Sequence, residues 1–386
     1  MRIMTIYGTR PEAIKVAPII KAIEAEEGMN SIAVVSGQHR EMLDQVNALF
    51  GISPAHDLNI MTAGQTLNEI VSKVITGVDE VLRLEEPDAV LVQGDTSTVM
   101  GAAIAAFNRQ IPVIHLEAGL RSGDISSPFP EEANRKLTSQ ITELHLAPTQ
   151  TSKQNLLNEG VSENDIVITG NSVIDALLFA TENFDTEFTN QRLEGLRRAK
   201  REGAGGRVLL VTAHRRENLG APMENIGAAV AEIARKIEDL TVVFAVHKNP
   251  KVRQAIYPAV EGLANVVLVE PLGYSEFTQA IGLADVVLTD SGGVQEEAPS
   301  LGKPVLVMRE NTERPEAVEA GTVKLIGTDR SRLVKEVCQL FDSKASYQEM
   351  AKAVNPYGDG SAARRTVGAI RWKFASGNRP LDFFAK

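Results

Sequence analysis

Short apolar runs alternate with amphipathic helical windows from one end of this 386-residue chain to the other. This alternation is typical of α/β folds that are built on parallel sheets. The predicted strands fall into two series. The first series is Ile3–Tyr7, Ser31–Val35, Ala89–Val92, Val113–Leu116, Leu144–Ala147 and Ile166–Thr169. The second is Val208–Val211, Thr241–Val246, Val266–Val269, Val286–Leu288, Val305–Val307 and Val323–Ile326.

A polar segment, residues 181–206, separates the two series and ends in glycines, which predicts a linker with a helical piece. We therefore expect two Rossmann-like, doubly wound domains, over residues 1–175 and 176–361. The last segment, residues 362–386, begins with a helical pattern and is expected to pack back on the first domain. Ligands of open parallel sheets bind beyond the carboxyl ends of the strands, so two such domains facing each other predict an interdomain cleft.

Charge and missing motifs argue against several classes of protein. The formal net charge of -10 disfavours nucleic acid or an anionic membrane as the main partner. A single cysteine excludes an intramolecular disulfide, and no ligand cluster indicates a metal site. Neither a Gly-Lys-Ser/Thr loop nor Gly-x-Gly-x-x-Gly opens the first helix, so no dinucleotide cofactor is expected. No run approaches membrane-spanning length, and the N-terminus does not have the pattern of a signal peptide. A cytoplasmic enzyme is the expectation.

The junction after the strand Val286–Leu288 gives the strongest binding signal. The chain continues through Ser291, Gly292 and Gly293 into a helical pattern. Free N–H groups at the start of a helix attract phosphate, and glycines let it approach the backbone closely. The Ser291 hydroxyl adds a donor, and Glu297 has the reach to accept from a ribose hydroxyl. A plain strand-to-helix turn capped by Ser291 explains the same residues. Motifs elsewhere in the chain are therefore needed to distinguish a phosphate site from such a turn.

The end of the first strand carries a similar junction. Gly8 and Thr9 predict a tight turn and a helix cap, and Pro11 suits the first turn of the helix. Arg10 and Lys15 then lie near the helix start, where basic residues oppose the helix dipole. A bound anion accounts for them, and ordinary surface charge is the alternative.

Three carboxylates follow strand ends or their loops: Asp95, Glu117 and Glu131. A helix cap is the alternative role for Asp95, and a first-turn acid is the alternative for Glu131. Three carboxylates that converge on one edge suit acid–base chemistry, because crowding and burial spread their pKa values.

Basic residues mark the second domain. His214 follows a strand and precedes two arginines, which suits charge stabilisation on a departing phosphate. Arg314 precedes a Pro-Glu pair, as Arg10 does, and is a candidate phosphate clamp. His115 and His145 lie inside apolar strands and are predicted to be satisfied core residues.

Taken together, six motifs in register resemble the non-hydrolysing UDP-N-acetylglucosamine 2-epimerases of bacteria. They are Gly8-Thr9-Arg10-Pro11-Glu12, Gln93-Gly94-Asp95-Thr96, His115-Leu116-Glu117-Ala118-Gly119-Leu120-Arg121, Pro130-Glu131-Glu132-Ala133-Asn134-Arg135, His214-Arg215-Arg216-Glu217-Asn218 and Asp290-Ser291-Gly292-Gly293-Val294-Gln295-Glu296-Glu297. The resemblance covers the whole chain. It implies a two-domain fold of the GT-B type, a homodimer, and interconversion of UDP-GlcNAc and UDP-ManNAc that supplies surface-polysaccharide synthesis.

The resemblance also assigns residues by position. It implies a catalytic set of Asp95, Glu117, Glu131 and His214. The implied UDP contacts are Arg10, Lys15, Ser291, Gly292, Gly293, Glu297 and Arg314, with Phe277 near the uracil. Some members bind a second UDP-GlcNAc as an activator. The corresponding positions here are Gln38, His39 and Arg40, but Glu41 replaces a glutamine and Gly64 replaces an arginine, so allosteric activation stays open.

The chemistry has to overcome the low acidity of the sugar C2 proton, since no carbonyl lies next to it. Departure of UDP from C1 first acidifies that proton, and anti elimination then gives 2-acetamidoglucal, to which UDP re-adds. The sequence leaves open which carboxylate is the base and which the acid. A glycosyltransferase of the same fold, a hydrolysing epimerase and a catalytically silent UDP-sugar sensor are the rivals. Three carboxylates in the first domain favour epimerisation.

Overall fold

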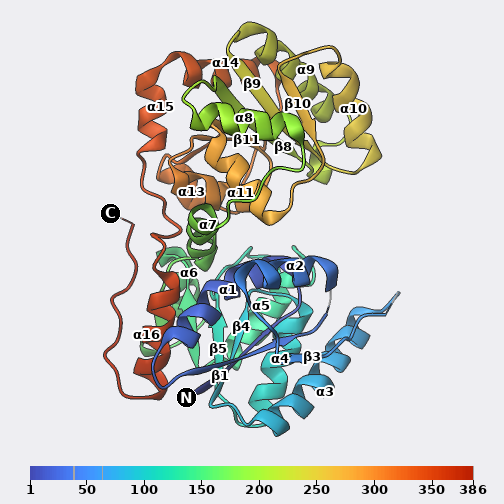
Figure 1. Cartoon of the computed structure of the whole chain (residues 1–386). Helices are drawn as coiled ribbons and strands as arrows, with labels where there is room; N and C mark the ends of the chain where they lie inside the picture. Colours follow the sequence, from blue (N-terminus) through green and yellow to red (C-terminus); the bar gives the residue numbers. More distant parts are fainter. Residues whose placement is uncertain (38–39, 63, 386) are drawn as a thin grey trace. The chain divides into compact units, whose positions relative to one another are not determined.

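The structure is a computed structural model that describes residues 1–37, 40–62 and 64–385, without the side chains of residues 40–42. The chain divides into two compact units, shown in Figure 1. The first unit is Met1–Ala176 together with Tyr357–Ala385, and the second is Leu177–Pro356.

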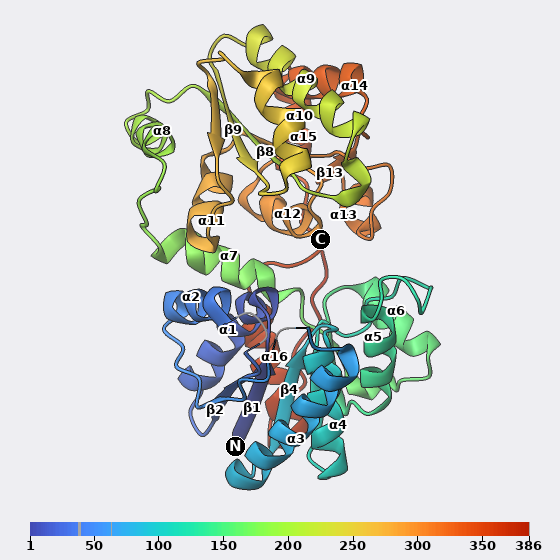
Figure 2. The ribbon, with the colours of Figure 1, turned by 90° about the vertical axis from the view of Figure 1, so that its right-hand side faces the viewer.

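The first unit is a seven-stranded parallel sheet in the order β3-β2-β1-β4-β5-β6-β7. Its strands are β1 (Arg2–Tyr7), β2 (Asn30–Val35), β3 (His56–Asp57), β4 (Ala89–Gln93), β5 (Val113–Leu116), β6 (Leu144–Ala147) and β7 (Ile166–Ile168). Its helices are α1 (Arg10–Ala25), α2 (Arg40–Phe50), α3 (Leu67–Glu85), α4 (Ser97–Asn108), α5 (Glu131–Gln140), α6 (Gln150–Asn158), η1 (Glu163–Asp165), the start of α7 (Ser172–Asn183), and α16 (Ala362–Phe374). Helices cover both faces of the sheet (Figure 2).

The second unit repeats this plan with six parallel strands in the order β10-β9-β8-β11-β12-β13. The strands are β8 (Arg207–Ala213), β9 (Leu240–Val246), β10 (Val266–Val269), β11 (Val286–Thr289), β12 (Val305–Val307) and β13 (Val323–Leu325). The helices are α8 (Gln191–Arg201), η2 (Arg216–Asn218), α9 (Ala221–Lys236), α10 (Pro250–Val260), α11 (Tyr274–Leu283), α12 (Gly292–Glu297), η3 (Ala298–Leu301), α13 (Pro315–Glu319), α14 (Arg330–Asp342) and α15 (Lys344–Ala351). The predicted fold class, two Rossmann-like α/β halves, is confirmed.

Apolar strand residues explain why both sheets form. In β4 every residue is buried, and Val90 and Val92 pack with Val74 of α3 and Ala102 of α4. A buried Val, Leu or Ile side chain contributes about 1.5–3 kcal/mol relative to an exposed one. A strand buried on both faces reads as a continuous apolar run, which is why the strand positions could be read from the sequence.

Two segments differ from a simple tandem arrangement. Helix α16 lies beside α1 in the first unit, and the N–H of Ala363 donates to Asp175 Oδ1 at 2.8 Å. The predicted linker begins inside α7, which ends at Asn183, and it contains α8. Asn190 caps α8 by accepting from the N–H groups of Arg192 and Leu193.

Each sheet has a point where the strand order reverses: between β1 and β4 in the first unit, and between β8 and β11 in the second. The loops after those strands leave the sheet in opposite directions, which opens a crevice suited to ligands. The candidate residues of each unit cluster at or near this point.

Candidate active site

A buried carboxylate ties the two strand ends together in the first unit. Glu12 is 2% exposed, and its Oε2 accepts from the N–H groups of Gly8 at 3.0 Å and Thr9 at 2.6 Å. Its Oε1 accepts from Thr96 Oγ1, after β4, at 2.8 Å. Burial raises the pKa of Glu12, although these hydrogen bonds act against the change. Thr9 and Glu12 form the capping box that starts α1.

Three donors from three other elements hold the carboxylate of Glu117. Lys15 of α1 forms an ion pair with Oε1, and Gln93 at the end of β4 donates to Oε2. Asn171, just after β7, donates its Nδ2 to Oε1 at 3.4 Å. Because an ammonium and two amides converge on it, this arrangement stabilises negative charge on Glu117.

The backbone of Glu117 is also unusual, with a φ of 65° in the left-handed region. A side chain other than glycine is disfavoured there, and such residues concentrate at functional sites. The conformation turns the chain sharply after β5, at the point where the carboxylate meets its donors.

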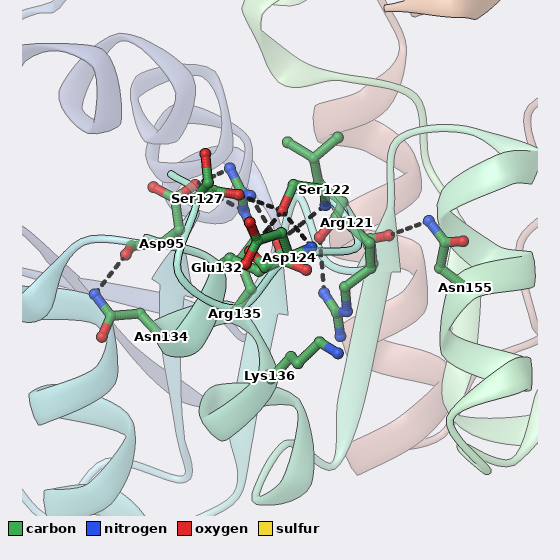
Figure 3. A network of polar contacts seen from close by, with 12 residues as sticks. Asp95, Arg121, Ser122, Asp124, Ser127, Glu132, Asn134, Arg135, Lys136 and Asn155 are labelled. Carbon is green, nitrogen blue, oxygen red and sulfur yellow. Dashed lines mark hydrogen bonds and ion pairs between the residues drawn. The ribbon is translucent and has the colours of Figure 1, made fainter. Parts of the chain in front are cut away.

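Asp95 belongs to a second network, drawn in Figure 3. Arg135 pairs with Asp95 Oδ2 at 2.6 Å and with Glu132 Oε2 at 2.9 Å, and Asn134 Nδ2 donates to the Asp95 carbonyl at 2.8 Å. Burial raises the pKa of Asp95; Arg135 opposes this change, and the charge of Glu117 adds to it. The charge of Glu117 therefore acts on Asp95 and disfavours its ionised form.

The cap role considered for Asp95 is excluded. Thr96 is the N-cap of α4, and its side chain accepts from the N–H of Val99 at 3.4 Å. Glu131 is the first residue of α5 and is partly buried; within the described part of the chain its side chain makes no hydrogen bond or ion pair. Its neighbour Glu132, which the sequence did not single out, is fully buried and holds Arg135.

The candidate activator segment lies largely outside the described residues. Gln38 and His39 are not described, and Arg40 begins α2 with its side chain undescribed.

Arg10, one of the predicted UDP contacts of the first unit, is the first residue of α1.

The two core histidines are buried, but the prediction that they are satisfied is wrong in part. His115 Nε2 donates to the carbonyl of Gly94 at 2.7 Å. For both His115 and His145, Nδ1 has no hydrogen-bond partner among the described residues. Burial lowers the pKa of His115 to about 4 and that of His145 to about 3, so both rings are neutral near pH 7.

In the second unit the buried carboxylate is Asp290, which has no exposed surface. It accepts from the N–H groups of His214 and Arg215 at the end of β8, and from Asn218 Nδ2 at 3.0 Å. His214 Nδ1 lies 3.0 Å from Asp290 Oδ1, which leaves Nε2 as the outer nitrogen. Burial alone would raise the pKa of Asp290, but the hydrogen bonds from His214 and Arg215 outweigh it and lower the pKa.

The start of α12 carries the residues that the sequence analysis assigned to an anion. Ser291 is the N-cap, and its N–H donates to Thr289 Oγ1 at 3.0 Å. Arg314 Nε pairs with Glu296 Oε1 at 2.6 Å, which holds the guanidinium against α12. A Cβ on Gly292 would lie 2.7 Å from Arg314 Nη1, so a larger residue at position 292 would displace this guanidinium. The arrangement brings Ser291, Gly292 and Arg314 together.

The remaining predicted contacts also lie in the second unit. A Cβ on Gly293 would lie 3.7 Å from Glu297 Oε1, which places that carboxylate beside the glycine pair. Phe277 lies in the first turns of α11 and is partly buried. The ring of His247 lies 6.1 Å from that of His214.

Two features are absent from the described residues. No group of three or more His, Cys, Asp or Glu side chains there has an arrangement that could hold a metal ion. None of the helices described has the length and apolar character needed to cross a membrane.

Comparison with known proteins gives a consistent result. The sequence profile of the UDP-N-acetylglucosamine 2-epimerase family matches residues 21–371. The UDP-N-acetylglucosamine 2-epimerase of Salmonella typhimurium is 49% identical over 371 residues, which are 96% of this chain and 98% of that protein.

Solved structures agree with the sequence match. A chain from Listeria monocytogenes is 46% identical and superposes with a TM-score of 0.93 over 99% of each chain. The UDP-GlcNAc 2-epimerase of Neisseria meningitidis, solved bound to UDP-GlcNAc, is 45% identical, with a TM-score of 0.83 over 96% of this chain and 99% of that one. The chain therefore belongs to the UDP-N-acetylglucosamine 2-epimerase family of isomerases.

Proposed function

We propose that this protein interconverts UDP-N-acetylglucosamine and UDP-N-acetylmannosamine by anti elimination of UDP and its re-addition to 2-acetamidoglucal. Membership of the family supports the overall reaction. The observation that carries the route is the pairing of Glu117, whose surroundings stabilise negative charge, with Asp95, whose pKa is raised. Epimerisation at C2 removes a proton from one face of the sugar and adds one to the other. Two interacting carboxylates in different environments suit these two transfers.

The first step breaks the bond between C1 and the diphosphate oxygen, and the electron pair leaves with UDP. The oxocarbenium character that develops at C1 acidifies the C2 proton. A carboxylate takes that proton, and the C2–H electron pair becomes the C1–C2 double bond. Protonation at C2 from the opposite face and return of UDP to C1 then give the epimer.

The leaving UDP is assigned to the basic groups. We assign it to Ser291, Gly292 and Gly293 at the start of α12, to Arg314 and His214, and to Arg10 and Lys15 of the first unit, with Glu297 on the ribose and Phe277 near the uracil. Asp290 behind the His214 ring stabilises an imidazolium there, as a buried aspartate does in a catalytic triad. Loss of one preorganised donor of this kind typically costs about 2.7–4 kcal/mol of transition-state stabilisation.

The carboxylates are assigned by their surroundings. Glu117 acts as the base that removes the C2 proton, because an ammonium and two amides around it stabilise its negative charge. Asp95 acts as the proton donor on the other face, because burial favours its protonated form. Glu131 at the start of α5 is the third member of the proposed catalytic set.

The test is proton NMR of the purified protein with UDP-GlcNAc in D2O. The expected result is a new UDP-ManNAc signal, with deuterium at C2 in both sugars. Free ManNAc together with UDP would indicate a hydrolysing enzyme instead. Bound UDP with no change in the sugar would overturn the proposal in favour of a transferase that lacks its acceptor, or of a sensor.

The proposal has three biological corollaries that the family resemblance supports. The enzyme works as a homodimer in the cytoplasm, and its UDP-ManNAc supplies ManNAc units for surface polysaccharides. Sedimentation of the purified protein tests the first corollary directly.

A further inference from the structure

Residues 376–385, which follow α16 and which we call the C-terminal tail, cover the outer edge of β7. Successive residues of a strand direct their backbone groups to opposite edges. Thr169 donates its N–H to β6 at 2.9 Å, so Ile168 faces the other way. There the N–H of Ile168 donates to Asp382 Oδ1 at 3.0 Å, and the N–H of Phe383 donates to the Ile168 carbonyl at 2.8 Å.

The tail also supports the turn that follows β7. Phe383 is 7% exposed, and a Cβ on Gly170 would lie 3.7 Å from its ring. The guanidinium of Arg365 lies 5.3 Å from the centre of the same ring and donates to the Thr169 carbonyl at 3.2 Å. The turn of residues 169–171 is therefore held between β6, Arg365 and the tail.

Asn171 carries this support to Glu117. Its N–H donates to the Tyr357 carbonyl at 2.6 Å, and its Oδ1 accepts from the N–H of Val173 at 3.1 Å. With Oδ1 committed to the start of α7, the amide has to direct Nδ2 toward Glu117 Oε1, 3.4 Å away. A continuous series of contacts thus joins Phe383 to a carboxylate 266 positions earlier in the sequence.

We propose that the C-terminal tail is a positioning element for proton transfer, which acts through the turn of residues 169–171 and Asn171 to fix the carboxylate of Glu117. Phe383 and Asn171 are then positioning residues. The inference rests on the proposed function, because it gives Glu117 the role of the base.

Adjacent phenylalanines provide a matched pair of variants. Phe383 is 7% exposed and Phe384 is 63% exposed. We expect Phe383→Ala to lower kcat roughly three- to tenfold, which is the effect of losing about one positioning hydrogen bond. KM for UDP-GlcNAc should stay within about twofold, because the UDP contacts are not involved. Phe384→Ala should leave both constants unchanged. An unchanged kcat in Phe383→Ala would overturn the proposal.

The fluorescence of Trp372, the only tryptophan, controls for simple loss of structure. Arg379 of the tail lies 5.6 Å from the centre of its ring, so release of the tail should alter its emission, while the unfolding midpoint reports overall stability. A fall in kcat in step with a large loss of unfolding midpoint would point to general destabilisation and would overturn the proposal.

Asn171→Asp tests the same contact without touching the tail. The aspartate keeps an acceptor for the Val173 N–H, but it places an oxygen instead of a donor next to Glu117. Lys15, Asp95 and His115 are charged or titratable groups that also face Glu117. A like charge added there should move the acid limb of the pH profile of kcat/KM to higher pH, by roughly half a unit or more.

The possible failures are distinguishable. If the wild-type protein does not exchange the C2 proton of UDP-GlcNAc in D2O, the proposed function fails and the tail proposal fails with it. If the wild type is active and Asn171→Asp shows an unshifted acid limb, only the positioning role is overturned.

Discussion

In each sheet one buried carboxylate accepts hydrogen bonds from the loops at the point where the strand order reverses. This carboxylate is Glu12 in the first unit and Asp290 in the second, and the partners of the two differ. In the first unit the partners of Glu12 among the described residues are neutral: the N–H groups of Gly8 and Thr9 and the hydroxyls of Thr9 and Thr96. In the second unit Asp290 accepts from backbone amides and also pairs with a histidine ring. The pKa of Glu12 is raised by burial, whereas that of Asp290 is lowered despite burial.

This difference separates a structural carboxylate from one with a chemical role. Glu12 joins two loops through neutral donors, and the amide oxygen of a glutamine could still accept from the N–H groups of Gly8 and Thr9. Asp290 accepts from the backbone N–H of His214 and also lies 3.0 Å from Nδ1 of its ring. In the first unit the carboxylates proposed for catalysis, Asp95 and Glu117, are separate from Glu12. In the second unit the buried carboxylate itself contacts His214, a residue of the proposed site.

The largest effect is expected for Asp290→Asn. The amide nitrogen has to face one of the donors at the end of β8, and the negative charge beside His214 is lost. We expect the unfolding free energy to fall by about 2–4 kcal/mol and the affinity for UDP to fall with it. Urea unfolding followed by circular dichroism and calorimetric UDP binding measure the two effects. Wild-type stability in this variant would contradict the role given to Asp290.

Glu117→Gln should lower turnover, which is assigned to the first unit, and leave UDP binding, assigned mainly to the second unit, nearly unchanged. The substitution keeps the shape of the side chain but removes the proposed base, so kcat should fall by about a hundredfold or more. UDP binding should stay nearly intact, because the proposed base is needed only for the proton transfer. Deuterium exchange at C2 of UDP-GlcNAc is the measurement. Wild-type turnover would rule out Glu117 as the base.

Most strands of both sheets could be predicted because they are buried on both faces and therefore read as apolar runs. The short edge strand β3 (His56–Asp57) is partly exposed and is not among the predicted strands. The hydrogen bond from the Thr9 N–H to Glu12 could also be predicted, because Thr9-x-x-Glu12 has the pattern of a capping box. Nothing local marks Asn171 or Gln93 as partners of Glu117. Their meeting depends on the order of strands β4, β5, β6 and β7, which the sequence does not state.

Adjacent acids show a second limit of sequence reasoning. In the pair Glu131-Glu132 either carboxylate could point into the site, and the direction of α5 decides which one is buried. Glu132 is buried and holds Arg135, which in turn holds Asp95. Similarly, Asp290 directly precedes the turn Ser291-Gly292-Gly293, but its hydrogen bond with His214 depends on the pairing of β8 with β11, which the sequence does not show.

The contributions of Asp290 and Glu12 to the free energy of unfolding should change with pH in opposite directions. The pKa of Asp290 is lowered from its ordinary 3.8, so its contribution to stability is present above that value and is lost as the pH falls through the lower folded value. The pKa of Glu12 is raised from 4.5, so its contribution is present below that value and is lost as the pH rises through the higher folded value. The cost of Asp290→Asn should therefore grow between about pH 3.5 and pH 7, and that of Glu12→Gln should shrink. Unfolding free energies at both pH values test this contrast, and costs that change in parallel would contradict it.

The smallest effect is expected for Glu12→Gln at neutral pH. The amide oxygen can accept from the N–H groups of Gly8 and Thr9, and the amide nitrogen can donate to Thr96 Oγ1 if that hydroxyl turns. We expect a change of less than about 1 kcal/mol in unfolding free energy. Trp372 lies in the first unit, so its fluorescence follows the unit that contains Glu12. A loss as large as that of Asp290→Asn would mean that Glu12 has to be charged, and the two carboxylates would then be equivalent.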